Sequence, residues 1–132
     1  MKTSGPTYRL TINHKPSYLH AVITGVNNEQ NVRHYLQDIL RECKARNCRK
    51  VLIEERLDGP RLGISSVFGI ASEESLQALG YFTAVAYVDA NIGDNDLMKF
   101  AETVARNRAL PAKVFFSVGD AEKWLTGMPG EC

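Results

Sequence analysis

The period of the hydrophobic pattern changes along the chain, and each period predicts one kind of secondary structure. Near the start, Leu10 and Ile12 alternate with polar residues, which is typical of a half-buried β-strand over Tyr8–Asn13. Turn-forming residues follow at 14–17, and a more apolar strand is expected over Tyr18–Gly25. Because the connection is short, we expect these two strands to pair in antiparallel orientation.

A long amphipathic helix is predicted next. From Val32 to Cys43, apolar residues recur at i, i+3, i+4, i+7, i+8 and i+11, which places them on one continuous stripe of a helix. Asn27 or Asn28 can cap the helix, and Glu29 in its first turn suits the helix dipole.

Strands and helices alternate over the rest of the chain. Apolar runs predict strands over Val51–Ile53, Phe82–Val88 and Lys113–Phe116. Helices are expected to begin near Ser65 or Ser66, at Asp94 or Asn95, and after Ser117. The first of these three helices is expected to end at Gly80.

This alternation predicts an α/β fold. The expected sheet is mixed, mostly parallel and five-stranded, with four helices in the order strand, strand, helix, strand, helix, strand, helix, strand, helix. No linker or repeat interrupts the pattern, so we expect a single domain over residues 1–132, with its core at about 8–126.

Composition narrows the class of protein. The chain has 132 residues, of which 44% are hydrophobic and 23% are charged, a balance typical of a globular domain. A net charge of +1 predicts no general attraction to nucleic acid or to an anionic membrane. Residues 1–11 lack the apolar core of a signal peptide, and no apolar run is long enough to span a bilayer. We therefore expect a cytoplasmic protein that binds neither nucleic acid nor membranes.

The spacing of the cysteines does not indicate a metal or redox site. There are three of them and no C-x-x-C pair, which argues against a zinc site or dithiol chemistry. This usage agrees with a reducing compartment. Cys43 falls on the apolar stripe of the first helix and is expected to be a small core residue, whereas Cys132 is expected to be mobile.

A parallel sheet brings its strand-to-helix connections to one edge, where ligands and partners are usually bound. Polar residues expected at this edge form the candidate partner or ligand surface: Asp58, Arg61, Asp89, Asn91 and Asn95. Clustered carboxylates can hold Mg²⁺ or Ca²⁺. Because the aspartates also suit turns and helix caps, however, no metal site is expected.

The junction between the third strand and the second helix reads Asp58-Gly-Pro-Arg-Leu-Gly-Ile-Ser65-Ser66. Two interpretations of the serine pair stay open. A serine hydroxyl at a helix start can cap an unpaired backbone N–H. Alternatively, Ser65 or Ser66 is a phosphoacceptor, since a phosphate there would meet the helix N-terminus and could pair with Arg61.

The element order resembles the STAS, or anti-sigma-factor antagonist, domain, and the serine pair strengthens the resemblance. In that family an Asp-Ser-Ser/Thr-Gly motif opens the second helix, and a partner kinase phosphorylates its first serine. The resemblance implies that Ser65 and Ser66 occupy the motif serines. Ile64 and Val67 stand where the family has aspartate and glycine, so the chain looks more like the divergent SpoIIAA-like group of bacterial proteins, whose function is not settled.

Catalytic motifs are missing from the sequence. It contains no nucleophile elbow, no P-loop and no G-x-G-x-x-G after a strand. Glu54 and Glu55 are adjacent in a strand and therefore point to opposite faces, which argues against a shared carboxylate pair. Aromatic residues such as Tyr87 are scattered through the strands and are expected in the core. We therefore predict no catalytic residue, no metal and no cofactor.

Two functions follow from these observations. The first is a non-catalytic, cytoplasmic interaction module of STAS type, with a kinase or regulator as its protein partner and serine phosphorylation as its switch. The alternative is a small anionic-ligand sensor or a minor enzyme, in which Arg61 offers its guanidinium to a carboxylate or phosphate. An unpaired edge strand over Tyr8–Asn13 would also allow a homodimer.

Overall fold

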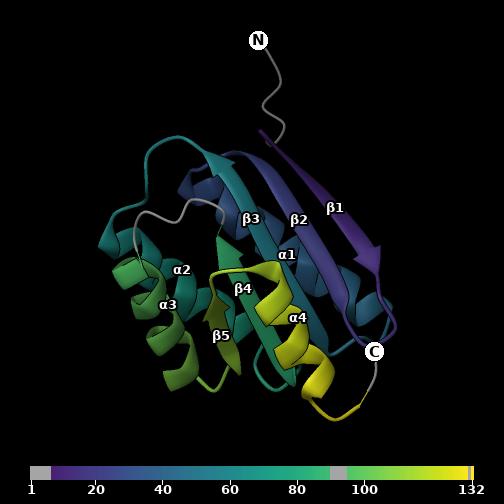
Figure 1. The fold of residues 1–132 in the computed structure, drawn as a ribbon. Coiled ribbons are helices and arrows are strands. Elements are labelled where there is room, and N and C mark those ends of the chain that lie inside the picture. The colour runs from purple at the N-terminus through teal and green to yellow at the C-terminus, as the bar shows by residue number, and fades with distance from the viewer. Residues whose placement is uncertain (1–6, 90–94, 131) are drawn as a thin grey trace.

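A computed structural model describes residues 7–89, 95–130 and 132 of the chain (Figure 1). Five strands within these residues form one sheet in chain order: β1 (Tyr8–His14), β2 (Leu19–Val26), β3 (Lys50–Asp58), β4 (Ala84–Asp89) and β5 (Ala112–Phe115). β1 is an edge strand antiparallel to β2, and the other neighbouring pairs are parallel. The predicted mixed, mostly parallel sheet is confirmed.

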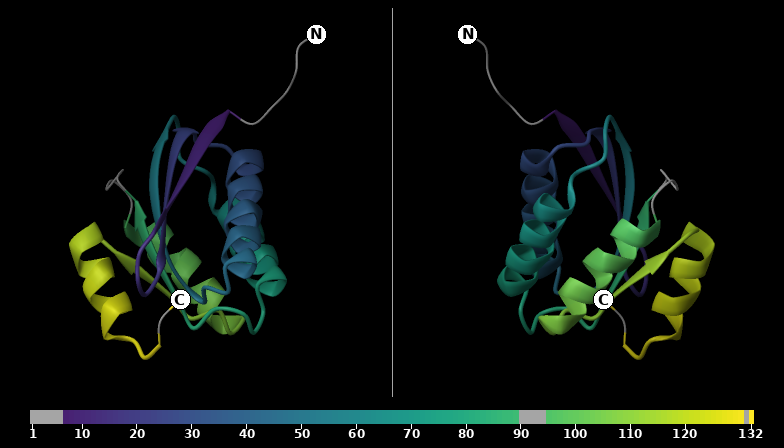
Figure 2. Two further views of the ribbon diagram at one scale, coloured as in Figure 1. Left: turned by 90° about the vertical axis from the view of Figure 1, so that its right-hand side faces the viewer. Right: turned by 90° about the vertical axis from the view of Figure 1, so that its left-hand side faces the viewer.

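The helices cover the two faces of the sheet unequally. They are α1 (Glu29–Ala45), α2 (Ile64–Gln77), α3 (Asn95–Asn107) and α4 (Val118–Gly127). Figure 2 shows α1, α2 and α3 on one face and α4 on the other. Parallel crossovers are almost always right-handed, and here each one advances to the next strand in the same direction. Three successive helices must therefore lie on the same face.

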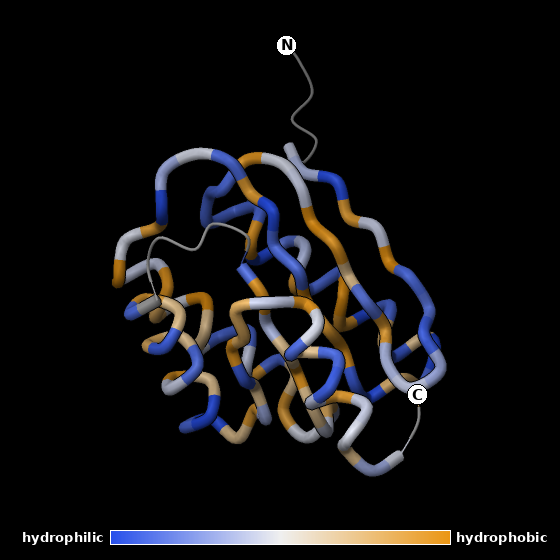
Figure 3. Tube along the Cα trace, viewed as in Figure 1, coloured by the Kyte–Doolittle hydropathy of each residue, from blue (hydrophilic) through white to orange (hydrophobic). Residues whose placement is uncertain are grey.

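The central strand β3 is buried on both faces. Val51 and Ile53 pack under α1, α2 and α3, whereas Leu52 packs with Leu125 of α4 on the opposite side. The apolar stretches of β2 and β3 lie side by side in Figure 3. This double burial explains why Val51, Leu52 and Ile53 of β3 form a continuous apolar run instead of an alternating pattern.

The first helix forms as its apolar stripe predicts. The side chain of Asn28 caps α1 by accepting a hydrogen bond from the backbone N–H of Asn31 at 2.8 Å. Tyr35, Ile39 and Cys43 on the stripe are all buried, so Cys43 is the small core residue that was expected.

The second helix begins in a different way from the prediction. Its N-cap is Gly63, which offers no side chain to the exposed backbone N–H groups. Ser65 and Ser66 instead lie inside the first turn, so the interpretation of these serines as helix caps is wrong. The helix ends at Gln77, before the Gly80 expected as its stop, and Gly80 has a positive φ of 75° in the following turn.

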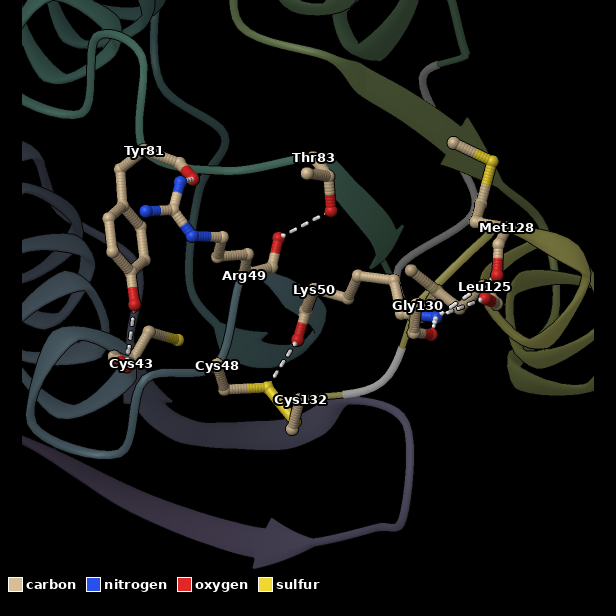
Figure 4. The surroundings of a disulfide bond; sticks show 10 residues. All are labelled: Cys43, Cys48, Arg49, Lys50, Tyr81, Thr83, Leu125, Met128, Gly130 and Cys132. Carbon is tan, nitrogen blue, oxygen red and sulfur yellow. Dashed lines mark hydrogen bonds between the residues drawn. A yellow bond between two sulfur atoms is a disulfide. The ribbon is translucent and has the colours of Figure 1, made fainter.

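The last helix is held at both ends. Ser117 caps its start by accepting a hydrogen bond from the backbone N–H of Asp120 at 3.1 Å, as predicted. At its other end, the ammonium of the buried Lys50 donates to the carbonyl oxygens of Leu125 (3.1 Å), Met128 (3.3 Å) and Gly130 (2.7 Å) (Figure 4). A cation is favourable there because the carbonyl end of a helix carries partial negative charge.

A disulfide fastens the end of the chain beside this lysine. Cys48, which is fully buried, is bonded to the exposed Cys132 (Figure 4). The expectation of a mobile Cys132 is therefore wrong, and the bond also differs from what a reducing compartment suggests. Cys48 and Cys132 are 84 residues apart, so sequence spacing could not show that the chain returns to β3.

Replacing Cys132 by serine is expected to lower the free energy of unfolding of the oxidised protein by about 2–4 kcal/mol, because the bond closes a long loop in the unfolded chain. Urea unfolding measures the difference, and dithiothreitol should abolish it. Thiol titration of the denatured, unreduced protein is an independent check, since the disulfide leaves Cys43 as the free thiol. Three reactive thiols after oxidation with glutathione would contradict the pairing.

Candidate functional site

A pocket of about 180 Å³ lies between the sheet and the three helices on its α1 side. Most of its wall is aliphatic or aromatic. The helices contribute Val32, Leu36, Ile39, Leu40, Val67, Ile70, Ala71, Leu97, Met98 and Ala101, among others. The sheet contributes Ile53, Val85, Tyr87, Ala112 and Val114. An apolar space of this size is suited to a ligand with little polar surface.

Small side chains leave this space unfilled. Ala71 and Ser75 of α2 line the pocket, together with Ala78 at the end of that helix and Ala101 and Ala105 of α3. These positions face the sheet with one or two side-chain heavy atoms at most, where protein cores usually carry larger side chains. The pocket is therefore a consequence of the residue sizes on α2 and α3.

One part of the pocket wall is polar and is centred on Glu55. The carboxyl belongs to β3, only 8% of the residue is exposed, and its Oε2 accepts hydrogen bonds from two tyrosine hydroxyls. Tyr35 donates from α1, and Tyr87 donates from the neighbouring strand β4 at 2.5 Å. Glu55 therefore ties the sheet to α1 through polar contacts inside an apolar layer.

Burial determines the protonation of this group. Desolvation raises the pKa of Glu55 to about 8; the hydrogen bond from Tyr87 opposes the rise, the Asp89 carboxylate adds to it, and Arg61 lowers it. Desolvation and the neighbouring carboxyl likewise raise the pKa of Tyr87 well above its usual value. Both groups are therefore uncharged at neutral pH.

Arg61 and Asp89, which the sequence placed at the same sheet edge, meet beside Glu55. Arg61 lies between β3 and α2, Asp89 ends β4, and their Nη1 and Oδ2 atoms are 3.4 Å apart. Both residues line the pocket. The parallel register pairs Asp89 with Glu55, which explains why the ion pair lies next to the buried carboxyl.

The other residues predicted for this edge do not all reach the pocket. Asp58 is exposed and is not part of the pocket wall, although its carbonyl accepts a hydrogen bond from the backbone of Asn27 at 2.7 Å. Asn95 is the first residue of α3, and Asn91 lies outside the described residues. The structure thus brings together Arg61 and Asp89 from the predicted set.

The two candidate phosphoacceptors lie in different surroundings. Ser65 is exposed, whereas Ser66 is half-buried. A hydrogen bond from Ser66 and another from Arg33 lower the pKa of Glu29, which connects the start of α2 to α1. Ser65 is therefore the more accessible hydroxyl of the pair.

The opposite face of the sheet holds a separate polar cluster. Glu54 accepts hydrogen bonds from His20 at 2.8 Å and from Arg56 Nε at 2.6 Å. Glu54 and Glu55 thus point to opposite faces, as predicted from their adjacency in a strand. Within residues 7–89, 95–130 and 132, no three His, Cys, Asp or Glu side chains are grouped so that they could hold a metal ion. The helices of that same part of the chain are each too short or too polar to cross a membrane.

Comparison with known proteins identifies the fold. No family model matches the sequence, and no match is found among curated proteins. Among solved structures, a protein of the DUF3478 family from Shewanella loihica PV-4, described as uncharacterized and as having a SpoIIAA-like fold, matches with a TM-score of 0.55. The match covers 95% of this chain and 98% of that chain at 20% sequence identity. The chain has a SpoIIAA-like fold.

In this SpoIIAA-like domain, the sequence analysis did not identify Glu55 and Tyr87 as site residues. Tyr87 was expected to be a core residue, and Glu55 was considered only as a neighbour of Glu54. One signal was available: Glu55 shares the inward register of β3 with Ile53 and Leu57, where an acidic residue is out of place. Its tyrosine partner on α1 could not be identified without the packing of α1 on the sheet.

Replacing Glu55 by Gln is expected to remove a pH dependence of stability. The folded chain keeps the Glu55 proton up to a pH of about 8, whereas a glutamate in the unfolded chain ionises near its ordinary pKa of 4.5. Unfolding therefore releases a proton in this window, and the free energy of unfolding of the wild type falls as pH rises. Relative to Glu55→Gln, the fall should be about 1 kcal/mol for each pH unit. Urea unfolding between about pH 5 and about pH 8 measures it, and parallel curves for the two proteins would show that Glu55 is ionised in the fold.

Proposed function

We propose that this chain is a binding domain for a small, mostly apolar molecule, which it holds between the sheet and helices α1, α2 and α3. The pocket of about 180 Å³ is the observation that carries this proposal. An apolar cavity of about 150 Å³ is large enough to bind benzene. The expected ligand is therefore about as large as one substituted aromatic ring or a short alkyl chain.

The charges around the pocket favour an uncharged ligand over the small anion considered from the sequence. Arg61, which could have offered its guanidinium to a phosphate or carboxylate, lies 3.4 Å from Asp89. An anion entering the pocket would have to compete with this carboxylate for the arginine. It would also lose its hydration among apolar side chains, which is unfavourable for a charged group.

Filling the pocket tests the proposal directly. Ala101 of α3 lines the pocket, and Ala101→Phe should place a ring in the space that the ligand would use. Binding of toluene, followed by ¹H–¹⁵N NMR titration, is expected to be saturable in the wild type and weaker by at least about tenfold in the variant.

A matched variant on the same helix controls for nonspecific effects of an added ring. Thr103 is exposed on α3, so Thr103→Phe should leave toluene binding unchanged. The shifted amide signals should belong to residues around the pocket, such as Val85 and Ala105. Absence of saturable binding in the wild type, or equal binding to wild type and Ala101→Phe, would contradict the proposed function.

A regulatory protein-interaction role is a second candidate, and the surface at the start of α2 favours it. Ile64 is 62% exposed and Phe68 is 46% exposed, on either side of the accessible Ser65. Exposed apolar side chains beside a modifiable hydroxyl would let a phosphate control partner binding. The predicted phosphorylation and its kinase belong to this second proposal.

The second candidate has its own test. Phosphate at Ser65 should be detectable by mass spectrometry of the protein isolated from its host, and Ser65→Asp should weaken retention of the partner that wild-type protein captures. Ser117→Asp, at the start of α4, is a control because it adds the same charge at an exposed serine elsewhere. An unmodified Ser65 together with identical capture by wild type and Ser65→Asp would remove this candidate.

A further inference from the structure

Glu55 differs from the other acidic residues that line the pocket. Glu74 lies 3.6 Å from Arg33, Asp89 lies 3.4 Å from Arg61, and Glu102 lies 3.6 Å from Lys99. Among the described residues, no basic nitrogen lies within 4.0 Å of the Glu55 carboxyl, whose hydrogen-bond partners are Tyr35 and Tyr87. The other three pocket acids are thus paired with a basic side chain, whereas the surroundings of Glu55 favour its protonated form.

The two tyrosines indicate where that proton is held. Both hydroxyls donate to the same oxygen, Oε2, which therefore acts as the acceptor of the carboxyl group. In a protonated carboxyl the other oxygen carries the hydrogen and is a donor. Oε1 of Glu55 is accordingly the donor, and the raised pKa of about 8 keeps it protonated at neutral pH.

The neighbouring charges leave this end of the pocket neutral. The groups that face Glu55 are Tyr35 from α1, Tyr87 and Asp89 from β4, and Arg61 from the connection before α2. The charges of Arg61 and Asp89 offset each other, and both tyrosines are uncharged. A ligand charge of either sign would therefore have no counter-charge that is not already paired, which is costly in an apolar site.

We propose that the ligand carries a neutral oxygen, a carbonyl or a hydroxyl, at one end and that Glu55 selects it by donating a hydrogen bond from Oε1. This inference rests on the proposed function, because it assigns the polar end of a molecule whose apolar part fills the pocket. The site would therefore distinguish small aromatic or alkyl ketones, aldehydes and alcohols from hydrocarbons of the same shape.

Three compounds of nearly the same shape separate the alternatives. Acetophenone carries a neutral carbonyl, α-methylstyrene replaces this oxygen with a methylene group, and benzoate carries a carboxylate. Their dissociation constants for the whole protein can be measured by NMR titration at a pH of about 6, below the pKa of Glu55. Wild type should bind acetophenone more tightly than α-methylstyrene and should bind benzoate least.

Variants at position 55 assign the preference to this side chain. Glu55→Leu removes the donor and should therefore reduce the preference for acetophenone. The ratio of the α-methylstyrene dissociation constant to the acetophenone dissociation constant should fall by about three- to tenfold. Glu55→Gln keeps an N–H donor and should preserve the ratio. Glu73→Leu makes the same change at an exposed glutamate of α2 outside the pocket wall and is the matched control, for which no change in the ratio is expected.

The pH dependence of the ligand preference is a further test. It should not change with Glu55 if this side chain only supports the structure of the pocket. The wild-type preference for acetophenone should vanish as pH rises through about 8, because an ionised Glu55 has no proton to donate. Glu55→Gln should keep its preference at high pH, since an amide does not ionise. Circular dichroism establishes that each variant is folded before its binding is compared.

The failures of the two proposals are distinguishable. If toluene binds and Ala101→Phe blocks it, but the acetophenone ratio is the same in wild type and Glu55→Leu, the head-group inference fails and the binding function stands. Tightest binding of benzoate would also overturn the inference, because the site would then select an anion. If none of the compounds binds to the wild type, both proposals fail.

Discussion

Glu55 lies in a strand that is covered on both faces, where a carboxyl group has to be neutral or paired with a cation. Here it is neutral because burial disfavours its charged form and, unlike the acidic residues nearby, it has no basic partner within 4.0 Å among the described residues. A neutral acid can remain beside an apolar space without drawing water or a counter-ion into it. The character of the pocket, and the chemistry of what it can hold, both depend on this one protonated group.

The pocket itself follows from the handedness of the chain. Three right-handed crossovers advance across the sheet in one direction, so α1, α2 and α3 must share one face. The small side chains of α2 and α3 then leave a space above β3 and β4. The same crossovers bring the carboxyl ends of β3 and β4 together, which sets the ion pair of Arg61 and Asp89 beside Glu55.

The sequence predicted the elements whose signals are local. The apolar stripe of α1, a cap at Asn27 or Asn28 and the element order are patterns of neighbouring residues. The structure has the stripe and the order, and it places the cap at Asn28. The N-cap of α2 was not predicted, because Gly63 occupies this position with an extended backbone and has no capping side chain that the sequence could reveal. The Cys48–Cys132 bond and the partnership of Tyr35 with Glu55 join residues far apart in sequence, and only the packed fold brings them together. Arg61 and Asp89 are an intermediate case. They are far apart in sequence, but the predicted sheet topology was enough to place both at one edge.

The protonation of Glu55 can be observed directly. In protein labelled with ¹³C-glutamate, the side-chain carboxyl carbon reports ionisation, and its signal is assigned by its loss in Glu55→Gln. The account predicts that this carbon titrates with a midpoint at a pH of about 8, in contrast to exposed glutamates. A midpoint near the ordinary value of 4.5 would mean that the carboxyl is charged in the folded protein, and the neutral, hydrogen-bonding end of the pocket would not exist.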